Sequence, residues 1–211
     1  MPHLPRVFVL GASLTIQFGP FLEKELAGRF HYDRKRATDG KRAEDDLDFP
    51  QGESGGDSGM CLSYLRHRRL KDPIPADVLL LSCGLHDIKI DPKIGTKQVS
   101  ADQFKLNLEQ IVDEVTAMKM ELAWLRITPV VDAIHNARST SFHRFAIDVD
   151  HYNQIADEVM HNAGAHVIDL HALCAPLVPD ALVDHIHYNE STRKKQAKSI
   201  ADDLTTWWGS R

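Results

Sequence analysis

Short apolar runs alternate along this chain with segments whose apolar residues recur every three or four positions. The runs predict strands buried within a sheet, and the periodic segments predict amphipathic helices. We predict strands at Arg6–Leu10, Arg29–Tyr32, Asp77–Cys83, Leu122–Thr128 and His166–Leu170. We predict helices at Pro20–Ala27, Gly59–Arg69, Ala101–Met118, Phe145–Asn162 and Ser191–Trp208.

The order of these elements indicates the fold class. A strand that is followed by a helix and a second strand forms a right-handed crossover, which makes the strands parallel and covers both faces of the sheet. Five such strands without a second core predict an α/β fold, a three-layer α/β/α flavodoxin-like sandwich with a five-stranded parallel sheet. With 211 residues and 43% hydrophobic content, residues 1–211 are expected to form a single domain with a full core.

One segment breaks the alternation. Residues Asp33 to Asp48 contain six acidic and five basic residues and almost no apolar ones. This composition is incompatible with a core element, so we predict a solvated charged loop over residues 33–52, next to the candidate site. Two interpretations of this loop stay open: a flexible surface insertion, or a loop that gates the site or recognises the substrate.

Charge and composition exclude several classes of partner. The net charge of −5 argues against a polyanion, and the basic run Arg66–Arg69 is short, so we expect no nucleic-acid partner. No apolar stretch has membrane-spanning length, and Val7–Leu10 is too short for the core of a signal peptide. An odd number of widely separated cysteines favours reduced thiols and a cytoplasmic location; they are Cys61, Cys83 and Cys174.

Three short segments carry candidate chemistry. Ser13 follows a buried apolar run within Gly11–Thr15, and such a position lies at the carboxyl edge of a parallel sheet, where α/β proteins build their sites. The segment Gly84–Asp87 follows a second apolar run. Near the end of the chain, Asp184 precedes His187 by three residues, so this imidazole is the candidate base for the hydroxyl and the carboxylate its orienting partner.

These segments, together with Gly56-Asp57-Ser58-Gly59, resemble the motif blocks of the SGNH or GDSL-like serine hydrolase (esterase) superfamily, in the same order and over most of the chain. That superfamily carries Gly-Asp-Ser, a glycine, Gly-x-Asn-Asp and Asp-x-x-His. In this sequence Ser13 matches the nucleophile, Gly56 the second-block glycine, and Asp184 and His187 the closing pair. Two positions depart from the pattern, because Ala12 replaces the aspartate of the first block and His86 replaces the asparagine of the third.

The resemblance implies a flavodoxin-like fold and a serine esterase that works through an acyl-enzyme on Ser13. It favours a small acyl group, such as the acetyl ester of a carbohydrate or a small alcohol, and requires no cofactor. The implied oxyanion hole consists of the backbone N–H groups of Ser13 and Gly56 and the side chain of His86. A histidine ring also carries an N–H donor, so the exchange of asparagine for His86 leaves a donor at this position.

A rival nucleophile is Ser54, because Gly52-Glu53-Ser54-Gly55-Gly56 fits the Gly-x-Ser-x-Gly elbow of α/β-hydrolases. That elbow must connect a buried strand to a helix, whereas the charged residues 44–51 precede it, which disfavours Ser54. A metal site is also disfavoured, since His185 and His187 lack a recognisable third ligand.

Two other functions stay open. An acyltransferase would use the same residues with an alcohol in place of water. A catalytically silent ligand-binding protein of the same fold is suggested by Ala12 and His86, although the retention of Ser13 with Asp184 and His187 speaks against it.

Overall fold

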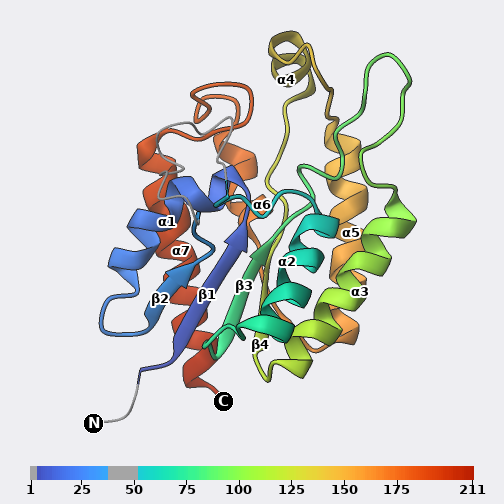
Figure 1. Ribbon diagram of the computed structural model, residues 1–211. Coiled ribbons are helices and arrows are strands. Elements are labelled where there is room, and N and C mark those ends of the chain that lie inside the picture. Colours follow the sequence, from blue (N-terminus) through green and yellow to red (C-terminus); the bar gives the residue numbers. More distant parts are fainter. Residues whose placement is uncertain (1–3, 38–51) are drawn as a thin grey trace.

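A computed structural model describes residues 4–37 and 52–211 (Figure 1). Within these residues, five parallel strands form one sheet in the order β2-β1-β3-β4-β5. This order, with the first strand between the second and third, is that of flavodoxin-like folds and confirms the predicted sheet. The strands are β1 (Arg6–Gly11), β2 (His31–Arg34), β3 (Val78–Ser82), β4 (Glu121–Leu125) and β5 (His166–Ile168).

Helices cover both faces of the sheet, which confirms the predicted three layers (Figure 1). Helices α1 (Ser13–Glu25) and α7 (Glu190–Gly209) pack on one face. Helices α2 (Ser58–Lys71), α3 (Ala101–Ala117) and α5 (Ala146–Asn162) pack on the other. Three short helices lie in connections near the carboxyl edge of the sheet; they are α4 (Asp132–Arg138), α6 (Leu170–Cys174) and the 3-10 helix η2 (Ala175–Leu177).

The central strand β3 explains why both faces need cover. Its residues Val78, Leu79, Leu80 and Leu81 are all fully buried. Because successive side chains of a strand point to opposite faces, Leu79 and Leu81 join the core under α2, α3 and α5, whereas Val78 and Leu80 join the core under α1 and α7. A continuous apolar run of this kind is typical of a parallel strand with helices on both sides.

The basic run at the end of α2 serves helix packing. Arg66 and Arg69 both form ion pairs with Glu114 of α3, at 3.3 Å and 2.5 Å. The cations also lie near the carboxyl end of α2, where the helix dipole favours positive charge. None of the described helices has the length and apolar character required to cross a membrane.

Strand β2 and the loop after it differ from the prediction. The strand was expected at residues 29–32 and the charged loop from Asp33, but Asp33 and Arg34 belong to the strand. Arg34 is only 8% exposed, because its guanidinium is paired with the buried carboxylate of Glu53. A charged side chain can enter the core when it meets an opposite charge, and this partner was not visible locally. Residues 38–51, which hold most of the predicted loop, lie outside the described residues.

Three further boundaries were wrong. Helix α1 begins at Ser13 and continues through Pro20, which we had taken as its start, because Ile16 and Phe18 in its first turns are buried against the sheet. Strand β4 ends at Leu125, three residues early, and β5 ends at Ile168. The short helices α4 and α6 were missed, since helices of seven and five residues are too short to show a period.

The early end of β4 has a specific cause in Asn153 of α5. Its side-chain oxygen accepts from the backbone N–H of Ile127 at 2.8 Å, and its amide nitrogen donates to the carbonyl of Ile127 at 3.0 Å. Both residues are buried. The side-chain amide of Asn153 thus takes the place of a neighbouring strand in bonding the backbone of Ile127, where the chain leaves the sheet next to the candidate site.

We expect Asn153→Ala to lower the free energy of unfolding by about 2–6 kcal/mol, because two buried backbone groups lose their partner at roughly 1–3 kcal/mol each. Denaturant unfolding of the purified variant measures this loss. The control is Asn162→Ala, which changes an exposed asparagine of the same helix and should stay within about 0.5 kcal/mol of the parent. Equal stability of the two variants would contradict the assigned role of Asn153.

Candidate active site

Ser13 lies where β1 passes into α1, at the carboxyl edge of the sheet (Figure 1). It is the first residue of α1, so its backbone N–H has no carbonyl partner within the helix. The turn requires Gly11, since a Cβ atom there would lie 2.9 Å from the carbonyl oxygen of Ser82 at the end of β3. The neighbouring strands β1 and β3 are those between which the strand order reverses, the usual position of ligand sites in open α/β sheets.

His187 connects Ser13 to Asp184. Its Nε2 atom lies 2.8 Å from Ser13 Oγ, and its Nδ1 atom lies 2.6 Å from Asp184 Oδ2. An ionised carboxylate can only accept, so Nδ1 carries the proton and the unprotonated Nε2 accepts from the Ser13 hydroxyl. His187 is buried, with 5% of its surface exposed. The structure therefore brings together the three residues that the sequence predicted as catalytic.

Asp184 is fixed by its own backbone neighbours. Its Oδ1 atom accepts from the backbone N–H groups of Ile186 and His187, both at 2.7 Å. Burial by itself would raise the pKa of Asp184, but these hydrogen bonds and the one from the His187 ring outweigh it and hold the pKa well below its usual range. Asp184 is therefore ionised at neutral pH and able to stabilise a positive charge on His187.

Gly56 lies in the loop that precedes α2, next to the end of β1. The N–H of Gly55 donates to the carbonyl of Gly11 at 2.7 Å, which holds this loop against the strand. The N–H of Gly56 donates to Ser54 Oγ at 3.1 Å. Gly56 has a positive φ of 68°, a conformation that favours glycine. The hydroxyl that meets an imidazole is therefore that of Ser13, whereas the Ser54 hydroxyl accepts from its own loop.

His86 follows β3 and lines the same cavity as Ser13 and Gly56. Burial, and then the positive charges of Lys89 and Arg144, lower the pKa of His86 to about 3. The ring is therefore neutral at neutral pH and carries a single N–H. A neutral ring can donate one hydrogen bond to a substrate oxygen without bringing a further charge into the cavity.

Asp87 anchors the loop that carries His86. It is fully buried, and its carboxylate accepts from the backbone N–H of Ser58 at 3.0 Å and from the Ser58 hydroxyl. Asn107 of α3 donates to that same hydroxyl at 2.8 Å. The start of α2 and the loop after β3 are thus tied through one carboxylate, which orients the loop rather than the His86 ring.

A model of the GDSL-like lipase/acylhydrolase family matches residues 9–194 of this sequence. The chain belongs to that family. It is accordingly a carboxylic ester hydrolase, which confirms the resemblance seen in the motif blocks. Curated proteins give no match to this sequence.

Solved structures of GDSL-like enzymes and other esterases share the fold. A lipase/acylhydrolase from Enterococcus faecalis is 14% identical with a TM-score of 0.71, over 96% of each chain. Psychrotrophic esterase EstA from Pseudoalteromonas sp. is 15% identical with a TM-score of 0.66, over 97% of this chain and 99% of that one. Acetyl xylan esterase AlAXEase is 15% identical with a TM-score of 0.62, over 95% and 98%. Identities this low establish the fold alone.

Sequence reasoning missed several residues that line the candidate site. Ile127 and Thr128, which follow β4, and Arg144, which precedes α5, line the cavity with Ser13. None of them lies in a motif block, and only the tertiary structure brings them to the nucleophile. Among the described residues, no group of three or more histidine, cysteine, aspartate or glutamate side chains could hold a metal ion.

The buried carboxyl group of Asp87 makes stability depend on pH. Burial raises its pKa from 3.8 to about 6, against the opposing hydrogen bonds from Ser58. Between these values the unfolded chain releases the proton while the folded protein keeps it, so this group's contribution to stability falls as pH rises from about 4 to about 6. Asp87→Asn cannot ionise, and its free energy of unfolding should gain about 3 kcal/mol relative to the parent over that range.

Denaturant unfolding of the parent and Asp87→Asn at several pH values tests this expectation. The Asp184 contribution is common to both proteins and cancels in the difference. A difference in stability that does not change between about pH 4 and pH 7 would show that Asp87 titrates as an ordinary carboxyl group.

Proposed function

We propose that this GDSL-like hydrolase cleaves its esters through an acyl-enzyme on Ser13, with His187 as the base and Asp184 as its orienting partner. The observation that carries the proposal is the pair of hydrogen bonds at His187, 2.8 Å to Ser13 and 2.6 Å to Asp184. Such a pair activates a hydroxyl that is otherwise a weak nucleophile.

The reaction has two steps. As Ser13 Oγ forms a bond to the ester carbonyl carbon, its proton passes to His187 Nε2, and Asp184 stabilises the resulting imidazolium. The same proton then goes to the departing alcohol when the bond between the carbonyl carbon and the alcohol oxygen breaks. Water, deprotonated by His187, attacks the acyl-enzyme in the second step and releases the acid with free Ser13.

Three donors surround the position of the developing oxyanion in this proposal. The backbone N–H of Ser13 belongs to the first turn of α1, whose dipole also favours negative charge. Gly56 contributes its N–H, which would exchange its present acceptor, Ser54 Oγ, for the substrate oxygen. The neutral ring of His86 is the third donor, in the place where the family pattern has an asparagine.

The cavity favours a short acyl group. Its volume is about 40 Å³, compared with roughly 150 Å³ for an apolar cavity that holds benzene. The cavity walls include the apolar side chains of Ile127, Leu170 and Ile186 next to Ser13. An acetyl ester of a carbohydrate or a small alcohol fits this description, and one of the similar structures is an acetyl xylan esterase.

The nucleophile is tested with two serine variants. Ser13→Ala should reduce the turnover of p-nitrophenyl acetate by on the order of 10⁴-fold, because only this hydroxyl can form the acyl-enzyme. Ser54→Ala is the matched control and should keep most of the activity, since the Ser54 hydroxyl accepts from the Gly56 N–H and forms no hydrogen bond with Ser13 or His187. Loss of activity in Ser54→Ala but not in Ser13→Ala would reverse the assignment. A p-nitrophenyl acyl series on the parent enzyme measures the preference for short chains.

His86 is tested by truncation and by restoration of the family amide. His86→Ala should lower kcat by roughly 10²–10³-fold with little change in KM, because a donor to the oxyanion acts mainly in the transition state. His86→Asn should recover part of this loss, since asparagine also offers an N–H. Normal kcat in His86→Ala, with reduced thermal stability, would make His86 a structural residue of the loop instead.

A further inference from the structure

Arg144 brings a positive charge into the wall of the active-site cavity. It lies in the segment between α4 and α5, and only 4% of its surface is exposed. It lines the same cavity as Ser13 and His86. Burial lowers the pKa of Arg144 to about 9, which leaves the guanidinium charged at neutral pH. A buried cation requires compensation, usually from a carboxylate.

The bonds that Arg144 makes within the protein are to neutral acceptors. Its Nε atom donates to the carbonyl of Leu85 at 2.5 Å, and its Nη1 atom donates to His135 Nε2 at 2.8 Å. Burial, and then the charge of Arg144, lower the pKa of His135 to about 4, so this imidazole is neutral. Within residues 4–37 and 52–211, Arg144 forms no ion pair, and its Nη2 atom has no hydrogen-bond partner. The outer edge of the guanidinium is therefore left for another acceptor.

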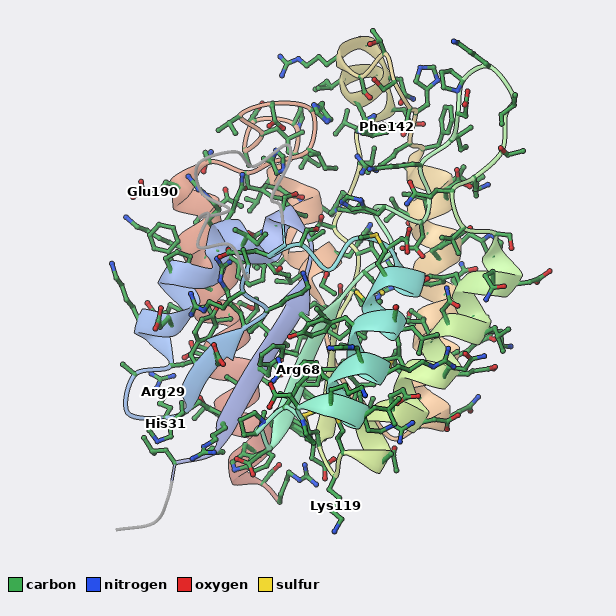
Figure 2. The ribbon with its side chains drawn as sticks, in the orientation of Figure 1. Arg29, His31, Arg68, Lys119, Phe142 and Glu190 are labelled. Carbon is green, nitrogen blue, oxygen red and sulfur yellow. The ribbon has the colours of Figure 1, made fainter. Side chains whose placement is uncertain are left out.

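A second cation lies close to Arg144. Lys89 and Arg144 both lie over the ring of Phe142, at 4.5 Å and 4.8 Å from its centre, and Figure 2 labels this ring in the connection between α4 and α5. Burial, and then the charge of Arg144, lower the pKa of Lys89 to about 8. The charge of Arg144 thus makes Lys89 harder to ionise, and an anion bound at Arg144 would offset this repulsion.

The acidic groups near this pair are already engaged. Asp184 accepts from the His187 ring, and Asp87 accepts from Ser58. Asp57 acts on Lys89 through its charge, but its carboxylate accepts from the N–H of Met60 at 2.9 Å and from Gln98 at 2.6 Å. Among the described residues, neither Arg144 nor Lys89 forms an ion pair with a carboxylate, although the charge of Asp57 partly offsets that of Lys89. The cavity wall at Arg144 therefore carries a positive charge without a bonded counter-ion.

We propose that Arg144 binds an anionic oxygen group of the substrate, so that this esterase acts on esters that carry a carboxylate or phosphate near the scissile bond. This inference rests on the proposed function and names its substrate class. The N–H groups of Nη2, which no described residue accepts, can donate to an oxygen of a carboxylate or phosphate, and the charge strengthens such a bond. The neutral ring of His86 keeps the oxyanion donor distinct from the charged site.

A different role would be support of the loop after β3. Through the carbonyl of Leu85, Arg144 holds the segment that carries His86, and its charge also favours any oxyanion at Ser13. Either effect would act on every ester alike, whether the substrate is charged or neutral. Discrimination between matched charged and neutral esters therefore separates substrate binding from loop support.

The first experiment compares substrates on the parent enzyme. For the alcohol half, kcat/KM is measured for 4-acetoxybenzoate, 4-acetoxyphenyl phosphate and neutral 4-acetoxybenzamide. For the acyl half, phenyl hydrogen succinate is compared with phenyl succinamate, and all spontaneous rates are subtracted. We expect at least one anionic ester to exceed its neutral partner by about 10–100-fold, the range of a hydrogen bond to a charged group. No preference in either half overturns the inference, while turnover of the neutral esters leaves the proposed function intact.

The second experiment changes the arginine. Arg144→Gln should abolish the preference by lowering kcat/KM for the anionic ester about 10–100-fold more than for its neutral partner. Arg138→Gln removes an exposed arginine of α4 and serves as the matched control, with the preference retained. Equal losses for charged and neutral esters in Arg144→Gln would assign Arg144 to loop support. If Arg144→Gln does not fold, the comparison on the parent enzyme decides alone.

The third experiment is independent of turnover. Calorimetry measures the binding of 4-acetoxybenzoate, 4-acetoxyphenyl phosphate and 4-acetoxybenzamide to the Ser13→Ala protein, in which the ester stays intact if Ser13 is the nucleophile. We expect an anionic ester to bind at least about tenfold more tightly than the amide. Equal affinities, or no measurable binding of either anion, contradict a site that binds an anionic group on the alcohol half of the ester. If no ester is hydrolysed by the parent, the proposed function fails, and this measurement still decides whether the cavity binds anions.

Discussion

The hydrogen bond between His187 and Ser13 joins two residues that are 174 positions apart, and the arrangement of the site depends on it. Ser13 is held by the close approach of β1 to β3 and by the first turn of α1, both fixed by the core. His187 is held by Asp184, whose carboxylate also accepts from two backbone N–H groups of the same turn. Each half is rigid by itself, so their contact requires that the C-terminal turn pack against the carboxyl edge of the sheet.

The loop after β3 lies between two buried charged groups of opposite sign, Asp87 and Arg144, which differ in their hydrogen-bond partners. The Asp87 carboxyl group is surrounded by donors from Ser58, which tie the loop to the start of α2. On the other side, Arg144 holds the carbonyl of Leu85 but meets no carboxylate in the described chain. His86 lies between these anchors and is kept neutral, because burial and two nearby cations oppose its protonation. The loop thus combines a fixed backbone with a cavity that is attractive to negative charge.

The two departures from the family motif have related physical consequences. Ala12 occupies the N-cap of α1 and provides no side-chain acceptor for the first turn. The Thr15 hydroxyl donates to the carbonyl of Ala12 at 2.7 Å, and the Ser13 hydroxyl lies against the His187 ring, so neither hydroxyl accepts from a backbone N–H of this turn. The N–H groups next to Ser13 therefore keep their partial positive charge, without a carboxylate beside them. The surroundings of Ser13, which also include neutral His86 and charged Arg144, are therefore more electropositive with Ala12 than they would be with an aspartate at that position.

The sequence alone determined the fold class, the strands of the sheet centre and the local geometry of the two halves of the site. Apolar runs and periodic segments report burial, and Asp184 lies close enough to His187 in the chain for a turn to join them. The boundaries of β2 and α1 were decided by tertiary contacts, namely the pairing of Arg34 with Glu53 and the burial of Ile16 and Phe18. The same holds for Arg144, whose position in the cavity follows from how α4 and α5 pack. Local patterns encode which residues are buried, whereas partners distant in the chain are chosen only when the layers assemble.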